Sequence, residues 1–423
     1  MKLVINKPTF ILYLFSFYCF ICFQLTEIKI NSVKINEIIS LLLVPVIIYQ
    51  LKVINKHLFY FLLFFLFILL VTIIKNLTQT FYLDTSALTI LRKPYLISIS
   101  RFFEFLACFA FAVIVWKTFV YLISKGLTKD RIVNAILSLN FYFSLLLIIA
   151  YLLYYFRILN YFNAQILYDT TAYLPEPTLR LKGYYIEGGP FGLFYAFLFC
   201  LSSTVNKRKY FQKAIFLVMI FLALSKAGMI AVVGWFFYRL FVKFRNNILT
   251  KYIIFLLIIP AFILIAFKIA DNYSASYNGI KEIITENPAD YNAVMGRLAA
   301  FFIAPNMIIH NPFLGIGLGN YPLVRNDPRY LGVIPEVPEW DLPGLGGLVT
   351  LLIENGIISF LIFLLILYII YKKYSKKSPM SKDSILLFII ICSLGVQLYF
   401  LYIWFLIGLA VTPEKEYLID ERL

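Results

Sequence analysis

The chain has 423 residues, of which 62% are hydrophobic and only 14% are charged, and its mean hydropathy is +0.86. This composition excludes an ordinary water-soluble domain, and the repeated apolar runs predict helices that cross about 30 Å of hydrocarbon. The formal net charge is +16. Because the basic residues gather in short segments between apolar runs, we attribute this charge to the inner loops of a membrane protein rather than to nucleic-acid binding.

We predict an all-α, polytopic integral membrane protein with about 11–12 transmembrane helices in a single membrane domain, residues 1–423. The first helices are expected at 9–25, 37–51, 57–74 and 101–123, and the fifth follows the basic turn 125–131 and ends near 156. The sixth helix is expected to start at Pro190, and the seventh and eighth follow the basic patch 207–213, are separated by a break near 225–228 and end near 242. The later ones are expected at 252–269, 347–370 and 384–411. The last run fits one tilted helix or two short helices separated near Gly395.

Charge distinguishes the two sides of these predicted helices. The segments on the side of the N-terminus are rich in lysine and arginine, and their only acidic residues are Asp130 and Asp383. This asymmetry predicts an inner N-terminus and places the loops 157–189 and 270–345 on the outer side. The larger loop begins with acidic and tyrosine residues: Asp271, Tyr273, Tyr277, Glu282 and Glu286. A loop of this length is usually functional or disordered, and its apolar content argues against disorder.

Two arginines of the outer loops are candidates for binding an anion. Arg180 lies ten residues before Pro190, with Lys182 close by, and Arg297 begins the helical stretch of the large loop. The planar guanidinium presents several donors in a fixed geometry that matches phosphate oxygens. The alternative is that each arginine only extends toward lipid headgroups at the membrane surface.

Two acids and a histidine also occupy notable positions. Glu187, in YYIEGGP, is expected at the start of a helix, where it is either a general base or a carboxylate stabilised by the helix dipole. Glu354, in LIENG, lies just inside an apolar run, where an acid is costly unless it is paired or hydrated. His310 ends the loop helix before Pro312, a common structural position for imidazole.

The glycine and cysteine patterns carry less chemical information. Gly315, Gly317 and Gly319 form a G-x-G-x-G run without the spacing of a dinucleotide-binding loop, so we expect tight backbone turns. All five cysteines fall in apolar runs and are expected to be buried structural residues. No spacing of ligands predicts a metal site.

Several motifs together resemble the O-antigen ligase/polymerase family. The large loop contributes Arg297 followed by HNPFLGIGLGNY, and the next helix contributes GLVTLLIENGIISFL. The other matching stretches are RLKGYYIEGGPFG from Arg180, FLALSKAGMIA from residue 221 and IWFLIGLA from residue 403. The resemblance therefore covers about 180–410. It departs from the family at Lys226, where an arginine is usual, and in EVPEWDLPGLGG, which lacks the histidine of the ligase branch and so favours the polymerase branch.

This resemblance implies a metal-independent glycosyltransferase of the bacterial inner membrane, with a cytoplasmic N-terminus, a periplasmic large loop and no cofactor. It would join oligosaccharide repeat units carried on undecaprenyl diphosphate, with no nucleic acid involved. Arg180 and Arg297 would hold the diphosphate, and Glu187 would act as base. The implied substrate-binding residues are Lys182, Tyr184, Tyr185, Lys226, His310, Tyr321 and Glu354. The implied partners are lipid-linked glycans, membrane lipids and a chain-length regulator.

Three alternatives remain open at this stage. The first is an O-antigen ligase that transfers finished glycan to lipid A-core. The second is a flippase or polysaccharide exporter, although transporters usually place charges at mid-membrane and contain internal repeats. The third is a non-catalytic partner of a biosynthetic complex.

Overall fold

The structure is a computed structural model that describes most of the chain. The described residues are 7–26, 28–30, 33–45, 54–84, 88–156, 158, 168–170, 179–205, 209–244, 278, 295–376 and 378–414. The helix expected at 252–269, the end of the helix expected at 37–51 and the acidic, tyrosine-rich start of the large loop lie outside these residues.

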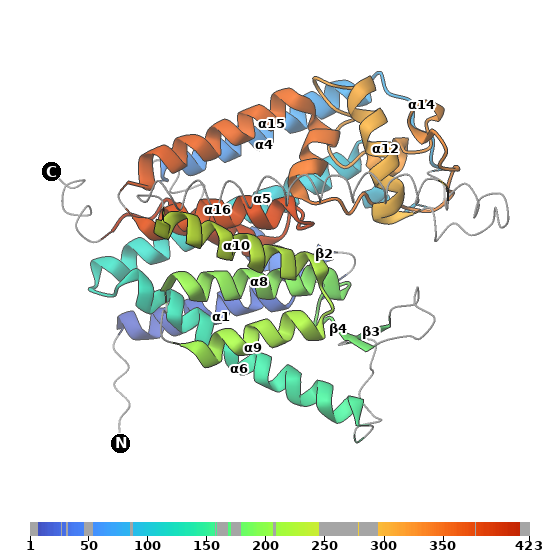
Figure 1. Ribbon diagram of the computed structural model, residues 1–423. Coiled ribbons are helices and arrows are strands. Elements are labelled where there is room, and N and C mark those ends of the chain that lie inside the picture. Colours follow the sequence, from blue (N-terminus) through green and yellow to red (C-terminus); the bar gives the residue numbers. More distant parts are fainter. Residues whose placement is uncertain are drawn as a thin grey trace. The chain divides into compact units, whose positions relative to one another are not determined.

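The described residues are predominantly helical, and the prediction of an all-α polytopic membrane protein is confirmed (Figure 1). The longer helices are α1 (Lys7–Gln24), α2 (Ile35–Leu42), α4 (Lys56–Asn76), α5 (Leu96–Ser124), α6 (Lys129–Tyr155), α8 (Gly188–Val205), α9 (Tyr210–Leu222), α10 (Lys226–Phe244), α12 (Gly296–His310), α15 (Gly347–Tyr374), α16 (Pro379–Ser393) and α17 (Leu401–Ala410). The short ones are the 3-10 turn η2 (Ile90–Arg92), α13 (Tyr321–Val324) and α14 (Pro328–Leu331).

Two small antiparallel hairpins accompany the helices. The first pairs β1 (Lys29–Ile30) with β2 (Val33–Lys34), and the second pairs β3 (Tyr168–Thr170) with β4 (Leu179–Leu181). In the second hairpin Asp169 is paired with Arg180 across the ladder. The sequence did not predict either hairpin.

Six helices of the described part of the chain are long and apolar enough to cross a membrane: α1, α4, α5, α6, α8 and α15. Local signals explain several of their ends. Thr128 caps α6 by accepting a hydrogen bond from the Arg131 amide at 3.3 Å, and Gly126 terminates the preceding helix with a φ of +93°. α5 begins at Leu96, five residues before the expected start at residue 101.

The last apolar run, expected at 384–411, forms two short helices, which is one of the two options that we gave for it. α16 ends at Ser393, Gly395 adopts a φ of +126°, and α17 begins at Leu401. The helix expected at 347–370 is present as α15, but it is not continuous. Gly356 inside it has non-helical backbone angles, with φ +72° and ψ −179°.

Internal contacts divide the chain into two compact units. Unit 1 comprises Met1–Phe67, Arg101–Val232 and Leu361–Leu423, and unit 2 comprises Ile68–Ser100 and Val233–Phe360. Each is described below by itself. That the whole chain acts as a single membrane domain stays a prediction.

Unit 1 has an aromatic core around α17. All ten residues of α17 are buried, and Gly408 lets this helix approach α5, since an added Cβ would lie 2.6 Å from the Ala112 carbonyl oxygen. Near it, the Phe23 ring contacts four other phenylalanine rings at centroid distances from 5.5 to 6.3 Å. A helix that is apolar on every side is expected at the centre of a bundle.

Unit 2 has a second core built on α12. Ala299, Ala300, Ile303 and Met307 of this helix are buried in one cluster with Tyr321 of α13. α12 also packs against α14, and Figure 1 shows the two helices next to each other. The helical stretch expected to begin at Arg297 is therefore confirmed.

Candidate functional site

The first group of predicted site residues surrounds the N-terminus of α8 in unit 1. Arg180 is the central residue of β4, and the chain then turns at Gly183, with φ +53°, to reach α8. The Arg180 guanidinium lies against the first residue of α8, because an added Cβ on Gly188 would lie 2.5 Å from its Nε and 2.9 Å from its Nη2. A side chain at residue 188 would therefore displace the arginine.

The break between α9 and α10 packs on the same helix terminus. Ser225 donates a hydrogen bond from Oγ to the Gly189 carbonyl at 3.0 Å and accepts one from the Gly228 amide at 3.1 Å. An added Cβ on Gly192 would lie 2.1 Å from the Cβ of Ser225. Leu224 adopts a φ of +49°, which is unusual for a residue other than glycine. The Gly-rich start of α8 thus fits the turn that contains Ser225.

We expect Ser225→Ala to lower the free energy of unfolding by about 1–2 kcal/mol, because it removes a helix cap and the side-chain hydrogen bond to the Gly189 carbonyl. Thermal unfolding of the purified protein in detergent measures this. Ser393→Ala, at an exposed serine that bonds only within its own helix, is the matched control and should change little. Equal transition temperatures for both variants would contradict this role of Ser225.

The electrostatics of this region favour an anion. Arg180 Nε is buried and has no hydrogen-bond partner among the described residues. Its cationic group also stands at the positive end of the α8 dipole, which is unfavourable for an arginine alone. An anion placed against the guanidinium and the first amides of α8 would satisfy the buried donor and both positive charges. The arrangement can therefore hold a phosphate group.

The neighbouring predicted residues differ in exposure. Glu187 directly precedes α8 and is half-buried, as are Lys182 and Tyr184, whereas Lys226 is the exposed first residue of α10. Tyr185 is 2% exposed, donates a hydrogen bond to the Phe23 carbonyl at 2.5 Å and stacks with surrounding aromatic rings. In this structure the Tyr185 ring is part of the core.

The second group lies in unit 2, where a loop that contains Gly315, Gly317 and Gly319, called the glycine loop below, fits into the break of α15 at Gly356. The amides of Ile316 and Gly317 donate to the carbonyls of Ile353 and Glu354, at 3.1 and 2.7 Å. On the other side of the break, the Ile357 amide donates to the Pro312 carbonyl at 2.8 Å. The loop thereby satisfies backbone groups that the interrupted helix leaves open. The tight turns expected at Gly315, Gly317 and Gly319 are confirmed by φ values of +65°, +97° and +76°.

Polar side chains from α4 and α5 hold this loop from outside. Thr72 Oγ1 accepts from the Leu318 amide, and Ser98 Oγ donates to the Leu318 carbonyl, both at 2.9 Å. Asn320, which is fully buried, donates from Nδ2 to Asn76 Oδ1 at 2.6 Å. These contacts fix the loop backbone.

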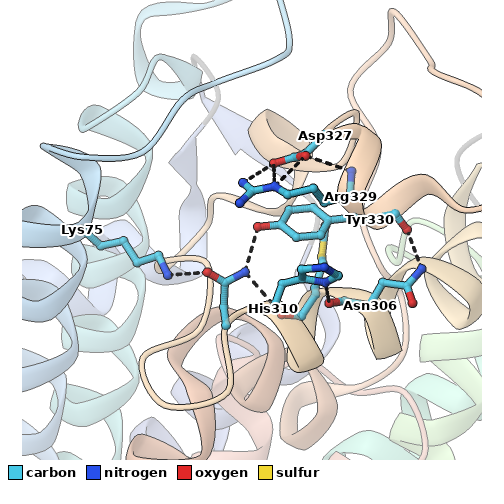
Figure 2. A network of polar contacts seen from close by, with 8 residues as sticks. Lys75, Asn306, His310, Asp327, Arg329 and Tyr330 are labelled. Atoms are coloured by element: carbon cyan, nitrogen blue, oxygen red, sulfur yellow. Dashed lines mark hydrogen bonds and ion pairs between the residues drawn. The ribbon is translucent and has the colours of Figure 1, made fainter.

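A larger polar network links Lys75 with the end of α12 and with α14 (Figure 2). Lys75 Nζ donates to Asn311 Oδ1 at 2.8 Å and also to the Gly315 carbonyl, and Asn311 Nδ2 donates to Tyr330 Oη at 2.7 Å. His310 Nδ1 lies 2.8 Å from the Asn306 carbonyl oxygen, one turn back in the same helix. The His310 side chain is exposed. Its contact with Asn306 holds it at the end of α12 (Figure 2).

Asp327 and Arg329 complete this network. Arg329 forms two hydrogen bonds from Nε to the carboxylate at 3.0 Å and one from Nη2 at 2.5 Å, and Asp327 also caps α14. Burial would raise the pKa of Asp327, but the bonds from Arg329 outweigh burial and keep this pKa below its ordinary value. The carboxylate therefore stays ionised.

Arg297 is exposed at the start of α12, and its side chain crosses Gly344, where an added Cβ would lie 2.7 Å from Arg297 Cγ. Asp341 accepts from the Gly296 amide at 2.7 Å and forms a buried ion pair with Arg325 at 2.9 Å. Burial raises the pKa of Asp341, and Arg325 opposes this shift. The buried pair thus fixes the helix start that carries Arg297.

The two remaining predicted residues are both buried. Tyr321 is fully buried in the unit 2 core, and burial raises the pKa of its hydroxyl. Glu354 is 9% exposed, and its backbone carbonyl receives the glycine loop. Within the described residues, no three His, Cys, Asp or Glu side chains gather as a candidate metal site.

The structure brings Arg180, Glu187 and the Ser225 turn to the start of α8 in unit 1. Arg297, His310, Tyr321 and Glu354 all belong to unit 2, where Arg297 and His310 lie at opposite ends of α12. That Arg180 and Arg297 act on one diphosphate stays a prediction. Sequence reasoning found the break at Ser225 but missed Lys75 and the Arg325–Asp341 pair. No local pattern marks these residues, because Lys75 bonds to Asn311 far along the chain and Arg325 and Asp341 are 16 residues apart in a loop.

Comparison with known proteins gives one family match. Residues 213–340 match the family model described as O-antigen ligase, which covers less than half of the chain. This region contains the Ser225 turn, α12 and the glycine loop. A search of the curated proteins found no match. The family match and the polytopic helical fold together make the chain consistent with the O-antigen ligase/polymerase family.

Proposed function

We propose that the protein is a surface-polysaccharide polymerase that joins repeat units carried on undecaprenyl diphosphate, at the periplasmic face of the bacterial inner membrane. The observation that carries the proposal is the buried Nε of Arg180 against the N-terminus of α8, which has no hydrogen-bond partner in the part of the chain that the structure describes. This donor would bind a phosphate oxygen, and the family model that the chain matches is described as O-antigen ligase.

The reaction would be a transfer at an anomeric carbon. A hydroxyl of one lipid-linked repeat unit attacks the anomeric carbon of the growing glycan, forming a new C–O bond. The bond from that carbon to the diphosphate oxygen breaks, and undecaprenyl diphosphate leaves. Arg180, with the amides of α8, stabilises the negative charge on the departing diphosphate. Glu187, next to the same helix start, accepts the proton of the attacking hydroxyl.

The other residues have supporting roles in this proposal. Arg297 contributes a second guanidinium to the diphosphate, and Lys182 and Lys226 attract the anionic substrate. Tyr184, which is half-buried, offers a ring for sugar stacking. His310 and Glu354, which belong to unit 2, are proposed as further substrate-binding residues.

Ligase activity is the second candidate, because the matching family model is described as O-antigen ligase. Purified full-length protein incubated with lipid-linked repeat units alone should produce a ladder of longer glycans on undecaprenyl diphosphate. Addition of lipid A-core should leave the ladder unchanged. Product only when lipid A-core is present would replace polymerase by ligase, and no product in either reaction would overturn the proposed glycosyl transfer.

A further inference from the structure

A cavity outside the candidate site lies between α1 and α6, which pack together in unit 1. Its volume is about 580 Å³, within the usual range of small-molecule pockets. Polar residues Arg131, Asn134 and Ser138 line it from α6, and Leu12 and Ser16 line it from α1. It therefore combines a cationic end with an apolar wall.

The polar residues form a stripe on α6. Positions 131, 134 and 138 are spaced by three and four residues, so their side chains share one face of the helix. Because α6 is long and apolar enough to cross a membrane, polar side chains along it are costly unless they meet partners or a polar ligand. Asn134 Oδ1 is buried without a hydrogen-bond partner among the described residues.

Charge in the cavity is positive at one end. Arg131 lies in the first turn of α6, where the helix dipole is also positive, and its side chain is exposed. An anion at this position would meet a guanidinium and a helix terminus together. Leu12 and Leu139 provide apolar lining for hydrocarbon chains.

We propose that this cavity binds an anionic phospholipid whose headgroup carries hydroxyl groups. The phosphate contacts Arg131, a headgroup hydroxyl donates to Asn134 Oδ1, and the acyl chains follow the apolar wall into the bilayer. Basic pockets between transmembrane helices bind anionic lipids by this combination of contacts. A zwitterionic choline lipid lacks both the net charge and the hydroxyl donor.

The test uses full-length protein, delipidated in mild detergent, with lipid binding measured by native mass spectrometry. Phosphatidylglycerol should bind more tightly than phosphatidylcholine. Arg131→Ala should weaken phosphatidylglycerol binding about fivefold to tenfold, from the loss of one cationic contact. Lys125→Ala removes an exposed basic residue from the turn before α6 and should leave binding unchanged.

A second variant tests the cavity itself without removing charge. Ser138→Leu narrows the space while keeping Arg131, and it should also weaken phosphatidylglycerol binding. Equal binding of the two lipids, or unchanged phosphatidylglycerol binding in either cavity variant, would overturn the proposal. So would displacement of the lipid by an equal concentration of inorganic phosphate, or a lipid-independent dimer that protects this face.

Discussion

Arg180→Met should reduce glycan polymerisation by about a hundredfold or more at equal protein level, because removal of one preorganised group that stabilises developing charge has effects of this size. The same substitution should leave the thermal stability of the substrate-free protein unchanged or slightly higher. The guanidinium stands at the positive end of α8, and its buried Nε has no partner among the residues that the structure describes, so its removal relieves an unfavourable arrangement. Methionine keeps the apolar stem that packs in this region.

This opposite response of activity and stability separates a binding role from a structural one. Product ladders and unfolding temperatures are measured on the same preparations. Lys209→Ala, at an exposed basic residue before α9, serves as the control and should change neither. A parallel fall of activity and unfolding temperature in Arg180→Met would show that Arg180 supports the fold, and a full ladder would remove it from the mechanism.

Composition and local signals were enough for much of the fold. Apolar runs predicted the membrane helices, the SKAG signal predicted one break, and Gly395 marked one of the two options for the last run, because glycine and capping residues act within a few positions along the chain. The glycine turns of the large loop were predictable for the same reason.

The features that escaped prediction depend on partners distant in the sequence. The break at Gly356 exists because Pro312 and the glycine loop supply hydrogen bonds to both sides of it. Lys75 has the sequence context of an ordinary basic residue at a helix end, and only the fold brings Asn311 to it. Arg325 and Asp341 form a buried pair across 16 residues of loop without a periodic pattern.

In the candidate site, too, local motifs were predictable and contacts between distant residues were not. Arg180, Glu187 and the Ser225 turn were each visible as motifs, but the packing of Ser225 on Gly189 and Gly192 is a tertiary contact. Tyr185 and Tyr321 show the converse, since an aromatic residue near a motif can serve the core as readily as a sugar.

Gly356→Ala should lower the free energy of unfolding by about 3 kcal/mol or more. Its φ of +72° with ψ −179° lies in a region essentially restricted to glycine, and strain of this kind costs about 1–3 kcal/mol. An added Cβ would also lie 2.2 Å from the Phe313 carbonyl oxygen and 2.6 Å from the Gly315 amide nitrogen. Because these are backbone atoms of the docked loop, relief of the clash requires the loop to move and break its hydrogen bonds to α15.

Substitutions at two other glycines separate the backbone strain from the steric clash with the loop. Gly126 has a φ of +93° with nothing within 4 Å of an added Cβ, so Gly126→Ala reports backbone strain alone, about 1–2 kcal/mol. Gly234 lies inside α10 in open space without a positive φ, so alanine there should stabilise by about 0.5–1 kcal/mol. Chemical unfolding of the three variants in detergent should therefore rank Gly356→Ala lowest, then Gly126→Ala, with Gly234→Ala at or above the wild type. A Gly356→Ala loss equal to that of Gly126→Ala would mean that the loop does not depend on its fit into the break of α15.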